Sequence, residues 1–127
     1  MIKDYCTGVQ HIGIPSNDIE KTKKFFANLG FTEVYSTVND GQKVAFLQLF
    51  NLMIETWESR DATEGVGAID HISIDVKKVD ELLPVVRAKG YEPLEGHVCQ
   101  LPYWENGVRF FTIMGPDKEK IEFCEKL

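Results

Sequence analysis

The sequence has few cysteines, no cluster of basic residues and no long apolar run. Its three cysteines, Cys6, Cys99 and Cys124, are odd in number and form no CxxC pair, which argues against a disulfide framework and indicates reduced thiols. Fourteen lysines and arginines against twenty acidic residues give a net charge of -6, which disfavours nucleic acid and anionic membrane surfaces as partners. The apolar core of a signal peptide and a membrane-spanning run of about 18 apolar residues are both missing. We therefore expect a cytoplasmic protein whose partner is a small molecule.

The composition is typical of one globular domain. Hydrophobic residues make up 43% of the chain and charged residues 27%, close to the average for soluble proteins. A chain of 127 residues buries a core without disulfides or metal ions as cross-links. We expect a single domain that covers residues 1–127.

The first half of the chain predicts a strand, a helix and three further strands. Residues 9–14 alternate as in a strand, and residues 17–30 have a helical pattern with Asn17 as N-cap and Gly30 at the C-terminal end. An Asp-Gly pair between the next two strand patterns predicts a hairpin. These three strand patterns cover residues 31–38, 43–50 and 52–58.

The second half repeats this order at a nearly constant spacing. A strand, a helix and three strands are predicted at residues 70–76, 79–90, 91–101, 108–114 and 120–127. Sixty residues separate His11 from His71, and the same number separates Gly30 from Gly90. The repeat therefore predicts two copies of one structural unit, each of which would be marginally stable alone.

Each copy carries a histidine on one face of its first strand. Because strand side chains alternate, His11 and Gly13 point away from the isoleucines beside them, and His71 and Ser73 do the same. The isoleucine face needs a helix to cover it. The small residue two positions after each histidine leaves room beside the imidazole.

A glutamate stands in the last strand of each copy, and it completes a possible ligand set. Glu55 and Glu122 align in the repeat and lie among apolar neighbours. Taken singly, a strand histidine is more often a hydrogen-bonded structural residue, and a strand glutamate more often faces solvent. Four matching residues favour a shared metal site, because two imidazoles and two carboxylates suit zinc, nickel, cobalt, iron or manganese. The predicted ligands are His11, Glu55, His71 and Glu122.

The double pattern resembles the vicinal oxygen chelate superfamily, which includes glyoxalase I, extradiol dioxygenases, methylmalonyl-CoA epimerase and bleomycin resistance proteins. The segments that carry the resemblance are HIGIPSNDIEKTKKFF, LMIETWE, IDHISIDV and GPDKEKIEF. The resemblance covers nearly the whole chain and implies an α+β fold of two tandem βαβββ modules, residues 8–60 and 66–127. Their curved mixed sheets would enclose a metal-binding cleft. The ligand pattern is similar to that of the glyoxalase I branch and implies one divalent ion per site.

The resemblance implies a lyase or isomerase of the lactoylglutathione lyase type. Such an enzyme transfers a proton through a metal-chelated enediolate of a small 2-oxo substrate or its thiol adduct. Glu122 would be the base, with Glu55 as ligand or helper. An extradiol dioxygenase remains an alternative, although it needs only one carboxylate and Glu55 argues against it. A drug-binding resistance protein of the same fold is the non-catalytic alternative.

The sequence gives weaker indications of the substrate contacts and of the oligomeric state. The substrate-binding candidates are Phe46, Gln48, Trp57, Tyr103, Trp104, Phe110 and Thr112, for which ordinary packing is an equal explanation. Arg109 is the one arginine expected near the cleft mouth, so the basic residues that grip glutathione are not evident. Small modules with exposed sheet edges predict a homodimer. The sequence leaves open whether a site is built within one chain or across two.

Overall fold

The computed structural model describes residues 1–28, 30–63, 67–114 and 120–127. Residue 66, at which the second predicted module begins, and residues 115–119 of the GPDKEKIEF segment lie outside the described residues. The chain divides into two compact units. We call His11–Asp70 the central unit, and Met1–Gln10 together with His71–Leu127 the terminal unit. The first strand, β1 (Cys6–Ser16), contributes residues to both units.

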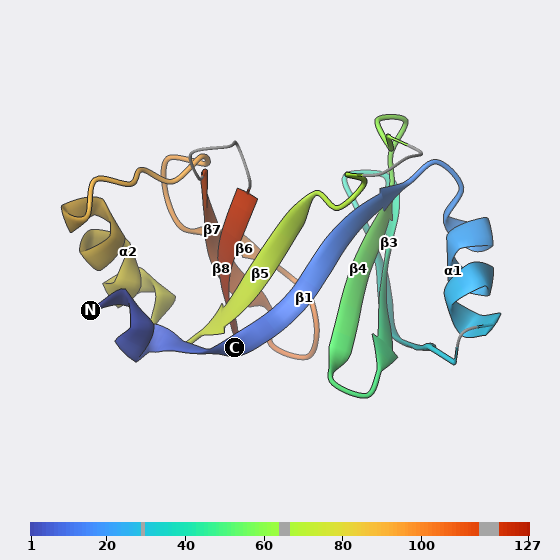
Figure 1. Cartoon of the computed structure of the whole chain (residues 1–127), viewed down its shortest axis with the longest axis horizontal. Coiled ribbons are helices and arrows are strands. Elements are labelled where there is room, and N and C mark those ends of the chain that lie inside the picture. The colour runs from blue at the N-terminus through green and yellow to red at the C-terminus, as the bar shows by residue number, and fades with distance from the viewer. Residues whose placement is uncertain (29, 64–66, 115–119) are drawn as a thin grey trace. The chain divides into compact units, whose positions relative to one another are not determined.

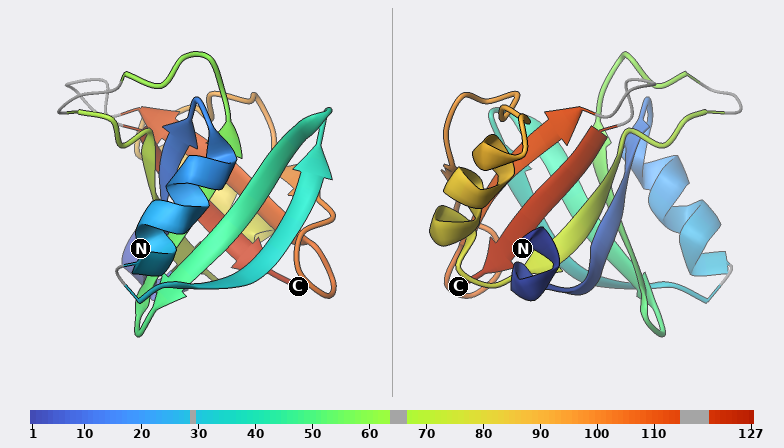
Figure 2. Two further views of the ribbon diagram at one scale, coloured as in Figure 1. Left: turned by 90° about the vertical axis from the view of Figure 1, so that its right-hand side faces the viewer. Right: turned by 60° about the vertical axis from the view of Figure 1, so that its left-hand side comes forward.

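The central unit contains one helix and the second half of β1 with three further strands. Its elements are α1 (Ile19–Asn28), β2 (Thr32–Asn39), β3 (Gln42–Leu49) and β4 (Leu52–Glu58). The strand order is β2-β3-β4-β1, in which β4 and β1 are parallel and the other pairs antiparallel (Figure 1). Helix α1 lies against one face of these strands, as Figure 2 shows. The core beneath it comprises Ile19, Phe31, Ala45, Leu47 and Ile54.

The terminal unit repeats this arrangement after a short 3-10 helix. Its elements are the 3-10 helix Ile2–Tyr5, β5 (His71–Val76), α2 (Val79–Ala88), β6 (Cys99–Leu101), β7 (Val108–Met114) and β8 (Lys120–Lys126). The strand order is β1-β5-β8-β7-β6, with β5 and β8 parallel. The core beneath α2 comprises Val76, Val79, Leu82, Leu83, Val86, Phe111 and Phe123. The predicted α+β class and the repeated strand and helix order are confirmed.

Two local predictions need correction, although the hairpin prediction is confirmed. Asp40 and Gly41 join β2 to β3 with φ angles of 51° and 78°, as the favoured two-residue hairpin requires. Helix α1, however, begins at Ile19, so its capping residue is Asp18 and not Asn17. The Asp18 carboxylate accepts a hydrogen bond from the Lys21 N–H at 3.3 Å. Two adjacent residues that both favour capping made the start ambiguous by one position.

The predicted strand at residues 91–101 was too long, because only Cys99–Leu101 forms β6. Pro93 has no N–H to donate, and Gly96 turns the chain with a φ of 84° and donates to the Pro93 carbonyl at 3.0 Å. Leu94 donates its N–H to the Thr112 carbonyl at 2.7 Å, which fastens this irregular segment to β7. Among the described residues no helix is long and apolar enough to span a membrane.

Candidate metal centre

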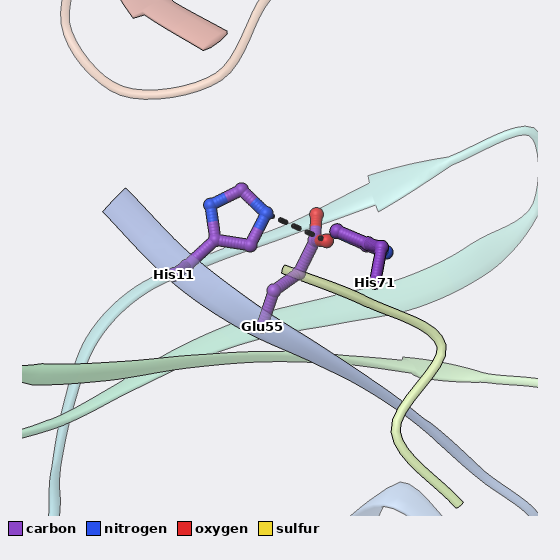
Figure 3. A group of neighbouring side chains, drawn as sticks. All are labelled: His11, Glu55 and His71. Atoms are coloured by element: carbon purple, nitrogen blue, oxygen red, sulfur yellow. Dashed lines mark ion pairs between the residues drawn. The ribbon is translucent and has the colours of Figure 1, made fainter. Parts of the chain in front are cut away.

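In the central unit, His11 and Glu55 form a close pair. The His11 Nε2 lies 3.4 Å from the Glu55 Oε1, and both side chains are largely buried (Figure 3). The parallel pairing of β1 with β4 brings them together, because Gly13 is the register partner of Glu55 and shares the face of His11. Gly13 contributes no side chain, so the carboxylate has room beside the imidazole. Phe46, opposite Glu55 on β3, holds the His11 ring edge-on at 5.7 Å between centroids.

The terminal unit contains an equivalent pair. The His71 Nε2 lies 3.0 Å from the Glu122 Oε2, and the two side chains are 12% and 11% exposed. Here β5 and β8 are the parallel strands, and Ser73 is the register partner of Glu122. In both units the histidine therefore lies two residues before the residue that faces the glutamate. The sequence repeat corresponds to a repeat in side-chain geometry.

His71 is the residue at which the chain leaves the central unit. Its neighbour Asp70 donates its N–H to the Gly13 carbonyl at 2.7 Å, so the peptide leading to His71 is held on β1. Each unit thus places an imidazole nitrogen beside a carboxylate oxygen. Two imidazole nitrogens and a carboxylate oxygen are the donors that borderline divalent ions prefer. The residues present therefore fit a metal ion by their chemistry.

The low exposure of both glutamates has an energetic consequence. A carboxylate removed from water is costly unless a cation or several donors compensate it. Glu55 and Glu122 are only 13% and 11% exposed, and each has an imidazole as its close neighbour. A surface carboxylate without a role would not need this arrangement. Buried acid and imidazole groups in equivalent positions are typical of a functional site.

Comparison with known proteins agrees with the repeated fold. A model of the glyoxalase/bleomycin resistance protein/dioxygenase superfamily matches residues 10–110. The chain belongs to this superfamily. The resemblance inferred from the sequence is therefore confirmed at the level of the superfamily. A comparison with curated proteins gave no significant match.

Solved structures of other superfamily members have the same fold. Methylmalonyl-CoA epimerase from Mycobacterium tuberculosis is 21% identical with a TM-score of 0.80, covering 97% of this chain and 90% of its own. A glyoxalase I variant from Zea mays is 17% identical with a TM-score of 0.67, covering 96% of this chain and 45% of its own. The manganese-bound glyoxalase from Novosphingobium aromaticivorans is 19% identical with a TM-score of 0.68, covering 95% of this chain and 39% of its own. At these identities the likeness shows the fold alone.

In the central unit of this superfamily domain, two of the predicted substrate residues lie close to Glu55. Phe46 is buried in register with Glu55, and Trp57 lies on the same face of β4 and is half-buried. Gln48 is exposed at the next position along that face of β3. Tyr35, which the sequence interpretation missed, is the register partner of Phe46 on β2, with ring centroids 6.0 Å apart. The alternation of β2 across the hairpin was the signal that could have identified it.

In the terminal unit, Thr112 is the candidate nearest to the paired residues. It is buried in register with Glu122, whereas Phe110 lies one step further along the same face, opposite Cys124. Tyr103 and Trp104 lie in the connection between β6 and β7. Tyr103 is buried, and the Lys126 Nζ lies 3.8 Å from the centre of the Trp104 ring. Of the substrate-binding candidates in the described part of the terminal unit, Thr112 is therefore the one in register with Glu122.

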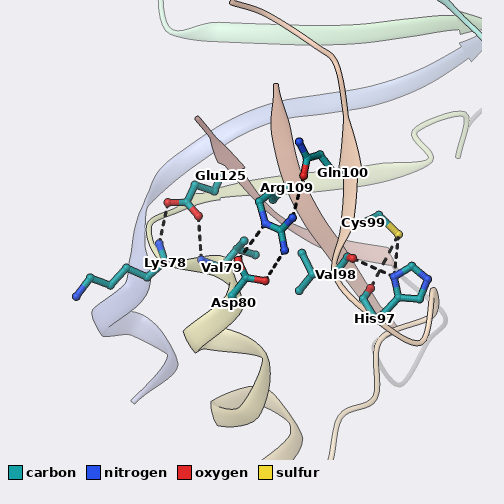
Figure 4. Close-up of polar contacts among 9 residues, drawn as sticks. All are labelled: Lys78, Val79, Asp80, His97, Val98, Cys99, Gln100, Arg109 and Glu125. Carbon is teal, nitrogen blue, oxygen red and sulfur yellow. Dashed lines mark hydrogen bonds and ion pairs between the residues drawn. The ribbon is translucent and has the colours of Figure 1, made fainter. Parts of the chain in front are cut away.

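Arg109 does not lie where it was expected. It alternates with Phe110 and Thr112, so it projects from the α2 face of β7, opposite to the face of Glu122. There its Nε donates to the Asp80 Oδ2 at 3.0 Å and its Nη1 donates to the Gln100 Oε1 at 2.9 Å (Figure 4). The hydrogen bond from the guanidinium lowers the pKa of the Asp80 carboxyl. This arginine is engaged at helix α2, so it is not a basic group facing Glu122.

Glu125, the residue after Cys124 on β8, contacts the start of helix α2. The Glu125 carboxylate accepts hydrogen bonds from the Lys78 and Val79 N–H groups at 2.9 and 3.1 Å, and so caps helix α2 from β8 (Figure 4). Burial, and secondarily the charge of Glu95, raises the pKa of the Cys99 thiol. A raised pKa disfavours a thiolate nucleophile at this cysteine.

Proposed function

We propose that this protein is a metal-dependent enzyme of the glyoxalase I type, a lyase or isomerase. Its substrate would be a small 2-oxo compound or its thiol adduct, and its reaction a proton transfer next to a carbonyl group. The observation that carries the proposal is the pair of equivalent, largely buried histidine–glutamate contacts at 3.4 and 3.0 Å. The cysteine usage and charge of the sequence support a cytoplasmic enzyme with no nucleic-acid partner.

The proposed ligands are His11, Glu55, His71 and Glu122, which would together hold one divalent ion. Zinc, nickel, cobalt, manganese and iron all suit two imidazoles and two carboxylates. A bound ion of this kind supplies a Lewis acid that polarises a carbonyl oxygen. The two negative charges of the carboxylates balance the charge of the ion, which supports a single ion and not two.

The two glutamates have different proposed roles. Glu122 acts as the base, which takes a proton from the carbon next to the carbonyl and returns it to the adjacent carbon. Glu55 acts as a ligand or helps the base. The buried ring of Phe46 lies beside Glu55, and we propose that it forms an apolar wall that keeps water from the reacting carbon. The further proposed substrate contacts are Trp57, Gln48, Phe110, Thr112, Tyr103 and Trp104.

Metal content is the first test of this function. Protein purified without chelators and supplied with nickel, zinc, cobalt and manganese should contain about one divalent ion per chain, because four protein ligands would bind a divalent ion tightly. Elemental analysis measures this content directly. His11→Ala should lose most of the metal, whereas His97→Ala is the matched control, because His97 is exposed and bonds to its neighbour Val98. A wild-type content below about a tenth of an equivalent would contradict the proposal.

We also propose that the enzyme is a homodimer. Strand β2 ends the sheet of the central unit, and its Val34 and Val38 are 39% and 63% exposed, which supports contact with a second copy. Light scattering at micromolar concentration should give about twice the chain mass, and a mass of 14.5 kDa would refute the dimer.

Mixing Glu55→Gln with Glu122→Gln chains tests whether a site is built within one chain or across two. Activity is regained in the mixture only if residues of two chains share a site.

A further inference from the structure

Two buried hydroxyl groups have no hydrogen-bond partner among the described residues. They are the Thr56 Oγ1 and the Ser73 Oγ, and both residues are 0% exposed. An unsatisfied hydroxyl in the interior lowers stability, so an apolar residue of the same size would normally be better there. Each of these residues therefore needs either a structural or a functional explanation.

The two hydroxyls lie in different surroundings. Thr56 is the register partner of Ala45 on β3 and of Ile14 on β1, so it lies among apolar residues of the central unit. It shares the face of Ile54, which belongs to the core beneath α1. Nothing ionisable is paired with it in either register. Thr56 is therefore a polar group within an apolar core.

Ser73 lies directly beside a proposed ligand. Its register partner on β8 is Glu122, and it shares the face of His71, whose Nε2 is 3.0 Å from the Glu122 carboxylate. On the other side of Glu122, the register partner is Thr112. In the central unit, Gly13 occupies the position of Ser73, so Glu55 has no hydroxyl at the equivalent place. The two glutamates therefore differ in the residue beside them on the parallel strand, and also on the antiparallel strand, where Phe46 is the partner of Glu55 and Thr112 that of Glu122.

We propose that Ser73 is a positioning residue that donates a hydrogen bond to the Glu122 carboxylate and orients it as ligand and base. The inference rests on the proposed function. A histidine nitrogen that binds an ion no longer has a proton or lone pair to share with a carboxylate, so Glu122 would lose its contact with the His71 Nε2. Ser73 is the adjacent buried hydrogen-bond donor, and its hydroxyl has no partner among the described residues. Ligating carboxylates generally need such a hydrogen-bonded support.

The test compares Ser73→Ala with Thr56→Val, which remove the two orphan hydroxyls separately. Thermal unfolding of the metal-free proteins should show that neither variant is less stable than the wild type. Competition with a chelator, with cobalt as the probe ion, should show about 10- to 100-fold weaker binding for Ser73→Ala and unchanged binding for Thr56→Val. Ser73→Thr, which keeps the hydroxyl, should recover most of the affinity.

The outcomes separate this inference from the proposed function. If the wild type binds no cobalt, both the proposed function and the role of Ser73 are wrong. If the wild type binds cobalt and Ser73→Ala binds it equally well with the same visible absorption spectrum, only the role of Ser73 is wrong. A purely structural role is indicated instead if Ser73→Ala lowers the unfolding temperature of the metal-free protein and Ser73→Thr fails to restore binding.

Discussion

Replacing Glu122 with glutamine is expected to lower the rate of proton exchange next to a carbonyl group by a factor of about 10² to 10⁴. The amide cannot accept the proton, whereas its similar shape preserves the packing of this largely buried side chain between its register partners, Ser73 and Thr112. The measurement is NMR in deuterated water with metal-loaded protein. Suitable substrates are 2-oxoaldehyde thiol adducts, 2-hydroxyketones and acyl thioesters.

Two glutamate variants serve as comparisons for Glu122→Gln. Glu55→Gln should retain more activity, because an amide oxygen still coordinates an ion and the proposed role of Glu55 is ligation. Glu125→Gln is the matched control, since Glu125 lies on the same strand but on the opposite face, where it caps α2. Its exchange rate should equal that of the wild type.

Other results would assign a different activity to the site. Metal-loaded protein that exchanges no proton but consumes oxygen with a catechol would be an extradiol dioxygenase. Protein that does neither but binds a drug-like ligand tightly would be a sequestering resistance protein. An unchanged exchange rate in Glu122→Gln would leave a metal enzyme whose base is another group.

Replacing Phe111 with alanine is expected to lower the free energy of unfolding by about 3–5 kcal/mol. Phe111 is 0% exposed, and its ring packs against Phe123 with centroids 5.2 Å apart in the core beneath α2. The loss includes the transfer of the ring out of the apolar interior and the cavity left behind. Because a domain has a total stability of about 5–15 kcal/mol, this change is large enough to threaten folding.

Urea unfolding followed by circular dichroism measures this effect, and Phe110 provides the control. Phe110 directly precedes Phe111 on β7, points to the opposite face and is only half-buried. Phe110→Ala should therefore lower the free energy of unfolding clearly less than Phe111→Ala does. Phe111→Leu should lower it by an amount between zero and the loss in Phe111→Ala. Equal losses in the two alanine variants would contradict the assignment of the β7 faces.

Much of the fold was predictable because strand alternation and hairpin turns depend on neighbouring residues. The period of two predicted that His11 and Gly13 share a face, and the Asp-Gly pair predicted the turn at Asp40 and Gly41. The ends of elements were less predictable. Asp18 took the capping position in place of Asn17, because both residue types favour it.

The repeated order of elements and the positions of the two histidines and two glutamates could be inferred from the sequence, since they follow from local periodicity and from similarity between the halves. Which side chains became neighbours depended on tertiary contacts. The parallel pairing of β5 with β8 put Ser73 beside Glu122, and the packing of α2 on β7 engaged Arg109 with Asp80 on the opposite face. Register and helix docking join residues that are far apart in the chain. They are set by the summed burial of whole faces, and no local pattern specifies them.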